Sequence, residues 1–118
     1  MDELAIYRPI IERILGEQLE FAAGDEEVEA FAVVDQNKEN YLLLEVGWQH
    51  PRRIYNIVFH LRLQQGKIRI EQDWTREGVG YQLVAAGVPP ELIELSYQPP
   101  ETRPLAQRQM SQQMVALS

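Results

Sequence analysis

The sequence predicts an α+β fold: an antiparallel sheet of about four strands, arranged as a β-meander, with an N-terminal helix and a second helix after the fourth strand packed on one face. Three observations lead to this prediction. Apolar and polar residues alternate along residues 52–63, as in a strand with one buried face. Short turn sequences separate this segment from similar segments on both sides. Apolar residues recur at helical spacing near the N-terminus and again after Trp74.

The first predicted element is an amphipathic helix over residues 2–19. Its apolar positions recur at helical spacing, with acids and arginines between them: Leu4, Tyr7, Ile11, Ile14, Leu15 and Leu19. Asp2 is expected to cap the helix, and Glu3 suits the positive end of its dipole. Pro9 removes one backbone donor, so we expect a kink there or a later helix start. Residues 21–25 are predicted to form a loop.

Four strands are predicted next, over residues 26–35, 41–48, 52–63 and 67–74. Alternation along the third strand predicts one face of Tyr55, Ile57, Phe59, Leu61 and Leu63, and an opposite face of Arg52, Asn56, His60 and Arg62. Ile54 and Val58 interrupt this second, polar face. We therefore expect the C-terminal segment or another subunit to cover part of it. Gly66 is expected to take a positive φ in the turn before the fourth strand.

A short helix is predicted from Thr75 to Ala86, with Thr75 as its N-cap, Glu77 in its first turn and Gly87 just past its end. Residues 90–95 are predicted to form one more helical turn, because Pro90 suits a helix start. From Pro99 onward the chain is rich in Pro, Gln and Ser with little periodicity. We therefore expect a single domain over residues 1–98 and an extended or disordered tail over residues 99–118.

Composition excludes several classes of protein. A chain of 118 residues forms one domain with a modest core. It has no cysteine, which excludes disulfides and thiolate metal sites. Its apolar runs stay well below the roughly 20 residues that span a bilayer. The acidic start, Met1-Asp2-Glu3-Leu4, differs from a basic signal peptide, so we expect a cytoplasmic protein without membrane contact.

The net charge of −7 is concentrated in the first 30 residues, which hold nine acids and two arginines. Such a surface repels the phosphate backbones of nucleic acids. It either docks a basic protein partner or serves as a solvated helix face. The candidate acidic partner surface consists of Glu12, Glu17 and Glu20.

The basic residues of the third and fourth strands form a second candidate interaction surface, a basic stripe of Arg52, Arg62, Lys67 and Arg69 with His60 beside it. Nucleic-acid binding would need stacking aromatics on this same face. Alternation points Tyr55 and Phe59 to the opposite face, and Trp48 and Trp74 are expected in the core. We therefore predict an accessory protein acting by protein–protein contact. Direct nucleic-acid binding through the basic stripe is the alternative.

No catalytic, cofactor-binding or metal-ligating residue is predicted. His50 and His60 are the only histidines, and a zinc site needs three or four converging ligands. Asp73, Thr75 and Glu77 are interpreted as a helix cap. A third hypothesis is an enzyme that uses His60 with a carboxylate, Glu71 or Asp73, and it requires these groups to converge in one pocket.

Several short motifs are distinctive in their order and spacing: Gly47-Trp48, Arg52-Arg53-Ile54-Tyr55, His60-Leu61, Gly66-Lys67-Ile68 and Gly87-Val88-Pro89. Over residues 4–98 they resemble the XisI family of cyanobacterial proteins, also called fdxN element excision controlling factors. The resemblance implies an accessory, non-enzymatic factor for programmed excision of a DNA element. It also implies a site-specific recombinase and an XisH-like companion protein as partners, and no catalytic residue. Self-association into a homo-oligomer through an exposed sheet face or edge is also expected.

Overall fold

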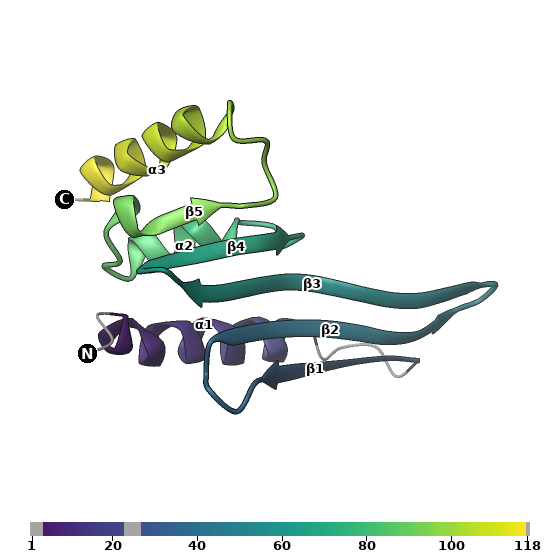
Figure 1. The fold of residues 1–118 in the computed structure, drawn as a ribbon. Helices are drawn as coiled ribbons and strands as arrows, with labels where there is room; N and C mark the ends of the chain where they lie inside the picture. The colour runs from purple at the N-terminus through teal and green to yellow at the C-terminus, as the bar shows by residue number, and fades with distance from the viewer. Residues whose placement is uncertain (1–3, 23–26, 118) are drawn as a thin grey trace.

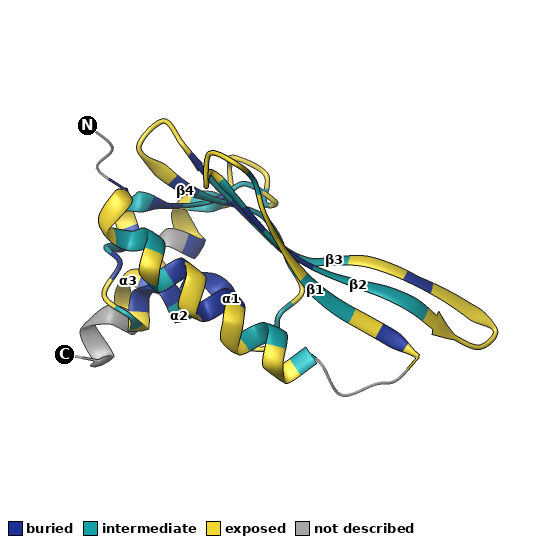
Figure 2. Ribbon diagram, turned by 90° about the horizontal axis from the view of Figure 1, so that it is seen from below, coloured by how far each residue is buried: buried dark blue, intermediate teal, exposed yellow. Residues whose placement is uncertain are grey.

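Five strands form one sheet in the order β1-β2-β3-β4-β5, and α1 and α2 lie on one of its faces (Figure 1, Figure 2). This computed structural model describes residues 4–22 and 27–117. The elements in chain order are the short 3-10 helix η1 (Ala5–Tyr7), α1 (Arg8–Ala22), β1 (Val28–Val34), β2 (Asn40–Gln49), β3 (Arg52–Gln64), β4 (Lys67–Asp73), α2 (Val79–Ala85), the 3-10 helix η2 (Pro90–Leu92), β5 (Ile93–Leu95) and α3 (Arg103–Leu117).

The α+β class and the antiparallel pairing of β1 to β4 are confirmed, but the sheet has a fifth strand and is mixed. β5 runs parallel to β4, with Ile68 opposite Ile93 and Ile70 opposite Leu95. The prediction of a helical turn was right for η2 and wrong for β5. Three residues are too few to show strand periodicity, and their partner strand lies more than twenty residues earlier in the chain.

The N-terminal helix begins late, as the proline suggested. η1 precedes α1, and Pro9 lies in the first turn of α1, where its missing N–H leaves no hydrogen bond unmade. α1 continues to Ala22, so Phe21 is helical and not part of a loop. The proposed cap Asp2 and residues 23–26 lie outside the described residues. Three residues of α1 are buried in the core: Ile11, Ile14 and Leu15.

The expectation of an extended or disordered tail needs correction, because α3 occupies residues 103–117. Ala106 and Met110 lie four residues apart on one side of α3 and are both buried. The contact with α2 is close: a Cβ placed on Gly80 would lie 2.9 Å from the Met110 sulfur. Gln, Arg, Met and Leu are good helix formers, and Pro104 falls in the first turn, so the polar composition concealed a helix.

A β-bulge in β3 reverses part of its predicted alternation. Phe59 lies opposite Leu43, but Ile57 lies opposite Leu44, so Val58 is an extra residue in β3. Val58 packs against the core. The predicted face is therefore wrong at Tyr55 and Ile57, which lie on the face away from the helices, opposite to Phe59.

The core lies between the sheet and the helices. Its fully buried side chains come from every layer: Tyr41, Leu43, Phe59, Leu61, Ile68, Ile70, Leu83, Val79, Val88, Ile93, Met110 and Ile11. Each large apolar side chain removed from water contributes roughly 1.5–3 kcal/mol. Two predicted glycine turns are confirmed, with φ of 72° at Gly66 and 105° at Gly87. None of the helices within the described residues has the length and apolar character needed to cross a bilayer.

The hairpin of β2 and β3 projects beyond the helices and beyond β4 (Figure 1, Figure 2). We call residues 44–57 the arm. β4 pairs with β3 only as far as Phe59, opposite Asp73, so it does not accompany the arm. β1 supports the arm on the other side, where Val28 lies opposite Gly47. The arm thus has one edge supported by β1 and one edge without a neighbouring strand among the described residues.

The contact between Gly47 and β1 is close enough to require glycine. The Trp48 N–H donates to the Glu27 carbonyl oxygen at 3.1 Å. A Cβ on Gly47 would lie 2.1 Å from that oxygen and 2.7 Å from the Val28 Cα.

We expect Gly47→Ala to lower the free energy of unfolding by roughly 1–3 kcal/mol, because the backbone of β1 must move away from the arm. Urea unfolding followed by circular dichroism measures this change. Gly16→Ala is the matched control, since a Cβ there meets nothing within 4 Å and alanine favours a helix. Equal unfolding midpoints for Gly47→Ala and the wild type would show that β1 yields without cost.

Candidate functional site

The sheet face away from α1 and α2 carries a continuous set of apolar side chains, which we call the apolar stripe. The strand register places its members side by side across three strands: Phe31 and Val33 of β1, Leu42, Leu44, Val46 and Trp48 of β2, and Tyr55 and Ile57 of β3. Tyr55 is 68% exposed, Trp48 44% and Val33 40%. A contiguous exposed apolar patch on a soluble protein typically marks an interaction site.

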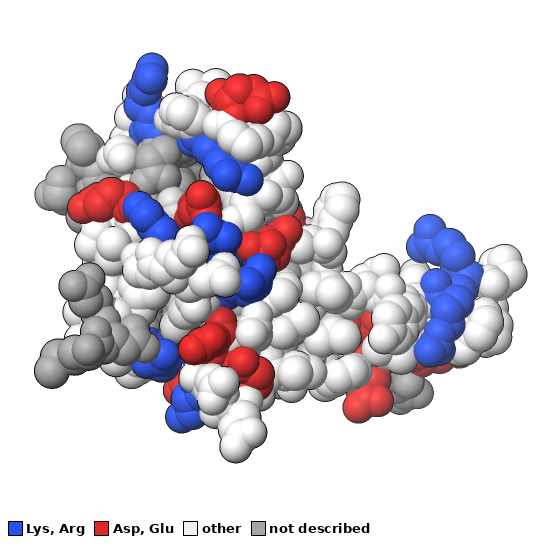
Figure 3. All heavy atoms as spheres, viewed as in Figure 1, with Lys and Arg blue, Asp and Glu red and all other residues white. Residues whose placement is uncertain are grey.

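The tip of the arm combines aromatic and basic groups. The rings of Trp48 and His50 stack with centroids 5.7 Å apart. The Arg53 guanidinium lies 5.5 Å from the Trp48 ring centroid and donates to the Gly47 carbonyl oxygen at 3.2 Å. Figure 3 shows the Lys and Arg atoms gathered at this end of the arm. The prediction that Trp48 belongs to the core is therefore wrong.

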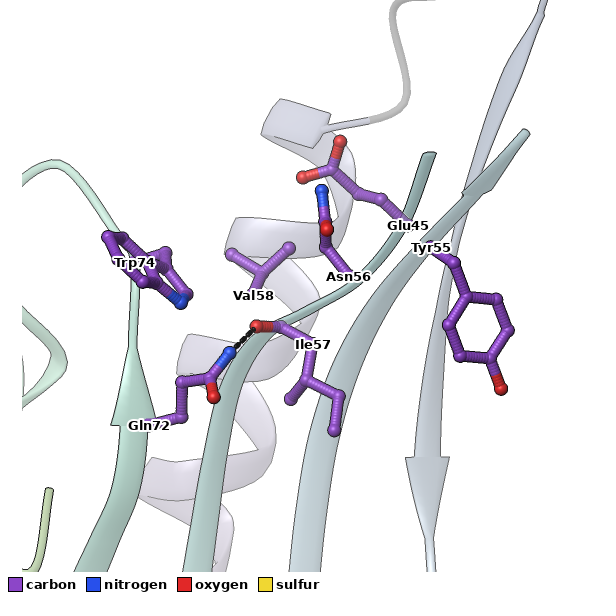
Figure 4. A pocket seen from close by; sticks show the side chains of 7 residues that line it. All are labelled: Glu45, Tyr55, Asn56, Ile57, Val58, Gln72 and Trp74. Carbon is purple, nitrogen blue, oxygen red and sulfur yellow. Dashed lines mark hydrogen bonds between the residues drawn. The ribbon is translucent and has the colours of Figure 1, made fainter. Parts of the chain in front are cut away.

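A groove opens where the arm leaves β4. It has a volume of about 580 Å³ and is lined by Glu45, Tyr55, Asn56, Ile57, Val58, Gln72 and Trp74. Tyr55 and Ile57 point to one side of β3, and Asn56 and Val58 to the other (Figure 4). The Gln72 side chain closes one end by donating to the Ile57 carbonyl oxygen at 2.5 Å. Trp74 is 76% exposed, so its prediction as a core residue is wrong.

Sequence reasoning missed both the apolar stripe and the groove. The cause is the bulge at Val58, which moves Tyr55 and Ile57 away from the face that holds Phe59. One signal was present: Ile54 and Val58 interrupted the polar side of the predicted strand. Ile54 lies on the helix side of the arm and is only 8% exposed. Val58 is the bulge residue itself and packs against the core.

The structure does not assemble the predicted basic stripe as one surface. Arg52 lies at the arm tip, on the sheet face that the helices cover. Arg62 lies at the other end of β3, and Lys67 and Arg69 lie on β4. Figure 3 shows acidic and basic atoms intermixed there, over β4 and β5.

Two of the four stripe cations form ion pairs, and a third donates to a backbone carbonyl. Arg62 lies 3.9 Å from the Glu71 carboxylate. The Lys67 Nζ donates to the Glu91 carbonyl oxygen at 2.6 Å. Arg69 Nε lies 2.9 Å from a Glu94 oxygen, at an angle that makes the contact an ion pair and not a hydrogen bond. These contacts reduce the charge that the stripe could offer to a phosphate backbone.

The predicted acidic surface lies on the solvent side of α1. Glu12 lies 4.0 Å from the Lys38 Nζ, and Glu17 lies 3.5 Å from the Arg13 Nε. Both pairs are exposed, so each contributes little to stability. Glu20 is also exposed. The surface is therefore on the helical side of the molecule, separate from the apolar stripe.

His60 is a hydrogen-bonded residue of the sheet. Its Nε2 lies 2.9 Å from the Asn40 side-chain oxygen. Burial lowers the pKa of His60 below its ordinary value, Arg62 lowers it further, and Glu71 partly opposes both. Neutral His60 is thus the form that the fold favours.

Asp73 holds the start of α2, so it has no free oxygen to pair with His60. One carboxylate oxygen accepts from the Thr75 N–H at 2.9 Å and from the Thr75 hydroxyl, and the other accepts from the Val79 N–H at 2.7 Å. The helix begins at Val79 with Gly78 as its N-cap, so the predictions of Thr75 as N-cap and of Glu77 in the first turn are wrong. Thr75 instead accepts from the Gly78 N–H at 3.1 Å, in the turn before the helix.

Asp73 pairs with Phe59 on the helix side, whereas His60 faces away. The hypothesis of acid–base chemistry by His60 with Asp73 is therefore wrong. Glu71, the other carboxylate in that hypothesis, opposes the lowering of the His60 pKa by burial but lies 3.9 Å from Arg62 as its ion-pair partner.

Among residues 4–22 and 27–117, no three His, Cys, Asp or Glu side chains are grouped as metal ligands. The features that stand out from the described surface are instead the apolar stripe, the groove and the aromatic–arginine tip of the arm. These are the residue types that dominate the energetics of protein–protein interfaces.

Comparisons with a family model and with solved structures find the same family. A family model described as "XisI protein" matches residues 1–108. The crystal structure of a XisI-like protein from Anabaena variabilis matches with a TM-score of 0.80 and 32% identity, over 87% of this chain and 94% of that one. The crystal structure of fdxN element excision controlling factor XisI from the same organism matches with a TM-score of 0.74 and 30% identity, over 86% of this chain and 99% of that one. A comparison with curated proteins found no match.

The lowered pKa of His60 makes stability depend on pH. In the unfolded chain His60 titrates near 6.5, so below that pH the unfolded state binds more protons than the folded state. We expect stability to be retained above about pH 6.5 and lost as pH falls from there toward the lower, folded-state pKa. His60→Gln should flatten this part of the profile, measured as urea unfolding midpoints between pH 8 and pH 5. Parallel profiles for the two proteins would contradict a role for His60.

Proposed function

Because this chain belongs to the XisI family, as its motifs indicated, we propose that it is an accessory factor that controls excision of a DNA element. The proposal for excision control draws on the similar protein from Anabaena variabilis, which is named as an fdxN element excision controlling factor. The mode of action that we propose is contact with other proteins, without a chemical step carried out by this chain.

The observation that carries this proposal is the apolar stripe. Its centre is apolar, with Leu44 flanked by Phe31 and Ile57 in the strand register. Its rim is charged or polar, with Arg53 at one end and Arg62 toward the other. An apolar centre with a polar rim is the usual anatomy of a protein–protein interface.

The partners that we propose are an XisH-like companion protein, bound directly, and a site-specific recombinase in the same assembly. The companion would bury the apolar stripe. Trp48 and Arg53 would supply most of the affinity, because large aromatic side chains and arginine are the usual binding hot spots.

The alternative function is direct nucleic-acid binding. One observation favours it: the arm tip presents Arg52 and Arg53 beside the stacked Trp48 ring. The ion pairs of Arg62 and Arg69 weigh against the longer stripe. We therefore rank protein contact first.

We expect Leu44→Glu to weaken binding of the XisH-like companion at least tenfold, which corresponds to about 1.4 kcal/mol, because a charge would enter the centre of the apolar stripe. Co-purification at low salt followed by titration calorimetry measures the loss. Phe21→Ser is the control: Phe21 is 79% exposed but lies on α1, so binding should be unchanged. Circular dichroism confirms that both variants fold. Failure of the wild type to capture the companion at low salt would count against the proposal.

Direct nucleic-acid binding has a separate test. We expect the wild-type protein to leave duplex DNA unshifted in a mobility assay at about 50 mM salt, because the chain carries a net charge of −7 and Arg62 and Arg69 are paired with carboxylates. A shift that weakens steeply with salt and disappears in the Arg52→Glu/Arg53→Glu variant would establish the alternative.

A further inference from the structure

The arm leaves part of β3 without a neighbouring strand. The last backbone hydrogen bond toward β4 is the one from the Trp74 N–H to the Val58 carbonyl oxygen, at 2.7 Å. Within the described part of the chain, no strand lies beside residues 52–56 on this side, although β2 pairs with them on the other. An extended edge with unpaired N–H and C=O groups is a template for a further strand.

The two ends of this bare edge carry opposite charges. At the tip, Arg52 lies on the helix side, contacts the neutral Gln49 side chain and forms no ion pair with a described residue. At the base, Glu45 lines the groove and likewise has no ion pair among the described residues. An antiparallel partner strand with the same sequence would bring each tip to the other's base, and so pair these charges.

The other sheet edges lack these properties. At β5, the Arg103 side chain donates to the carbonyl oxygens of Leu95 and Ser96, and α3 packs beside the strand. At β1, the edge carries the acid Glu29 but no lysine or arginine along Val28–Val34, so it offers no charge complementarity to a second copy.

We propose that two copies of this chain form a symmetric dimer by pairing residues 54–56 of β3 antiparallel, around a two-fold axis at Tyr55. Arg52 of each copy then lies on the same face as Glu45 of the other, because both residues lie on the helix side of the sheet. Tyr55 and Trp74, which are 68% and 76% exposed in the single chain, become buried at the interface. The interface is isologous, as expected of the commonest homodimers.

The proposed pairing would also join the sheets and the apolar stripes of the two copies. Edge-to-edge antiparallel pairing about a two-fold axis perpendicular to the sheet keeps each face on its own side. The two sheets become one, and the two apolar stripes lie next to each other on a surface of doubled width. The dimer does not depend on the function proposed above, since it involves the edge of β3 and the groove and leaves Leu44 uncovered.

The first test uses the absence of cysteine from the chain. Sedimentation velocity of the wild type should show a species of twice the chain mass. In Tyr55→Cys the two new thiols lie across the axis, within the Cα separation of about 4.4–6.8 Å that a disulfide allows. Mild oxidation should therefore convert most of this variant to a covalent dimer. The control is Val33→Cys on β1, which is 40% exposed and should cross-link at least tenfold more slowly.

The second test reverses the charges. Arg52→Glu and, separately, Glu45→Arg should each raise the dimer dissociation constant at least tenfold. The combined variant should restore it to within a few-fold of the wild type, because the charges are again opposite across the interface. A merely destabilised fold would not be rescued in this way.

Each remaining outcome overturns the dimer. A wild type that is monomeric at 100 µM would contradict it. Faster cross-linking at Val33 than at Tyr55 would place the interface at β1 instead. A dimer that persists in both charge-reversed variants would show that the arm is not the interface. The Leu44→Glu companion assay can fail while the dimer stands, and the dimer can fail while companion binding stands, so the two proposals are tested separately.

Discussion

The extra residue in β3 is the constraint on which the functional surface depends. With Val58 inserted opposite the Leu43–Leu44 step of β2, the side chains on the two sides of the bulge exchange faces. The core face keeps Phe59 and the residues after it, while Tyr55 and Ile57 join β1 and β2 residues on the face away from the helices. A second irregularity, between His60 and Leu61 in the pairing with β4, lies where β4 leaves the sheet. The bulge at Val58 and this second irregularity lie where the arm separates from β4 and the groove opens.

The distribution of charge explains why this surface suits protein contact better than phosphate binding. On β3 and β4, Arg62 and Arg69 are paired with the carboxylates of Glu71 and Glu94, which reduces the positive potential that extends into solvent. At the arm tip the arginines contact neutral groups and lie beside an aromatic ring. Among the described residues, Arg52 at the tip and Glu45 at the base have no ion pair, and these two residues would meet in a symmetric dimer. The bare edge of β3, the exposed aromatic side chains and the opposite charges thus favour one arrangement of two chains.

Support for the arm comes from one side only. β1 is held against it by the close approach of Gly47 to the Glu27 carbonyl, where any side chain would collide with backbone. The opposite edge gains no such support within the chain, and its Ile57 carbonyl is met by a side chain, that of Gln72. A hairpin with a neighbouring strand on one edge is less stable than a pair of strands inside a sheet. A strand from a second copy on the bare edge would therefore stabilise the arm as well as form the dimer.

Much of this molecule follows from its sequence alone. Periodicities of 3.6 and 2 placed α1, β1 to β4 and α2 within a few residues, because each depends on neighbours close in the chain. Composition excluded disulfides, and the spacing of motifs such as Gly47-Trp48 and Gly87-Val88-Pro89 identified the family. Tertiary structure decided the rest. The faces of the arm depend on a bulge that strict alternation cannot reveal, since one inserted residue inverts every prediction beyond it. β5 exists only because Ile70 lies beside Leu95, and α3 is held where Met110 meets Gly80. These are contacts between distant segments, and no local pattern encodes them.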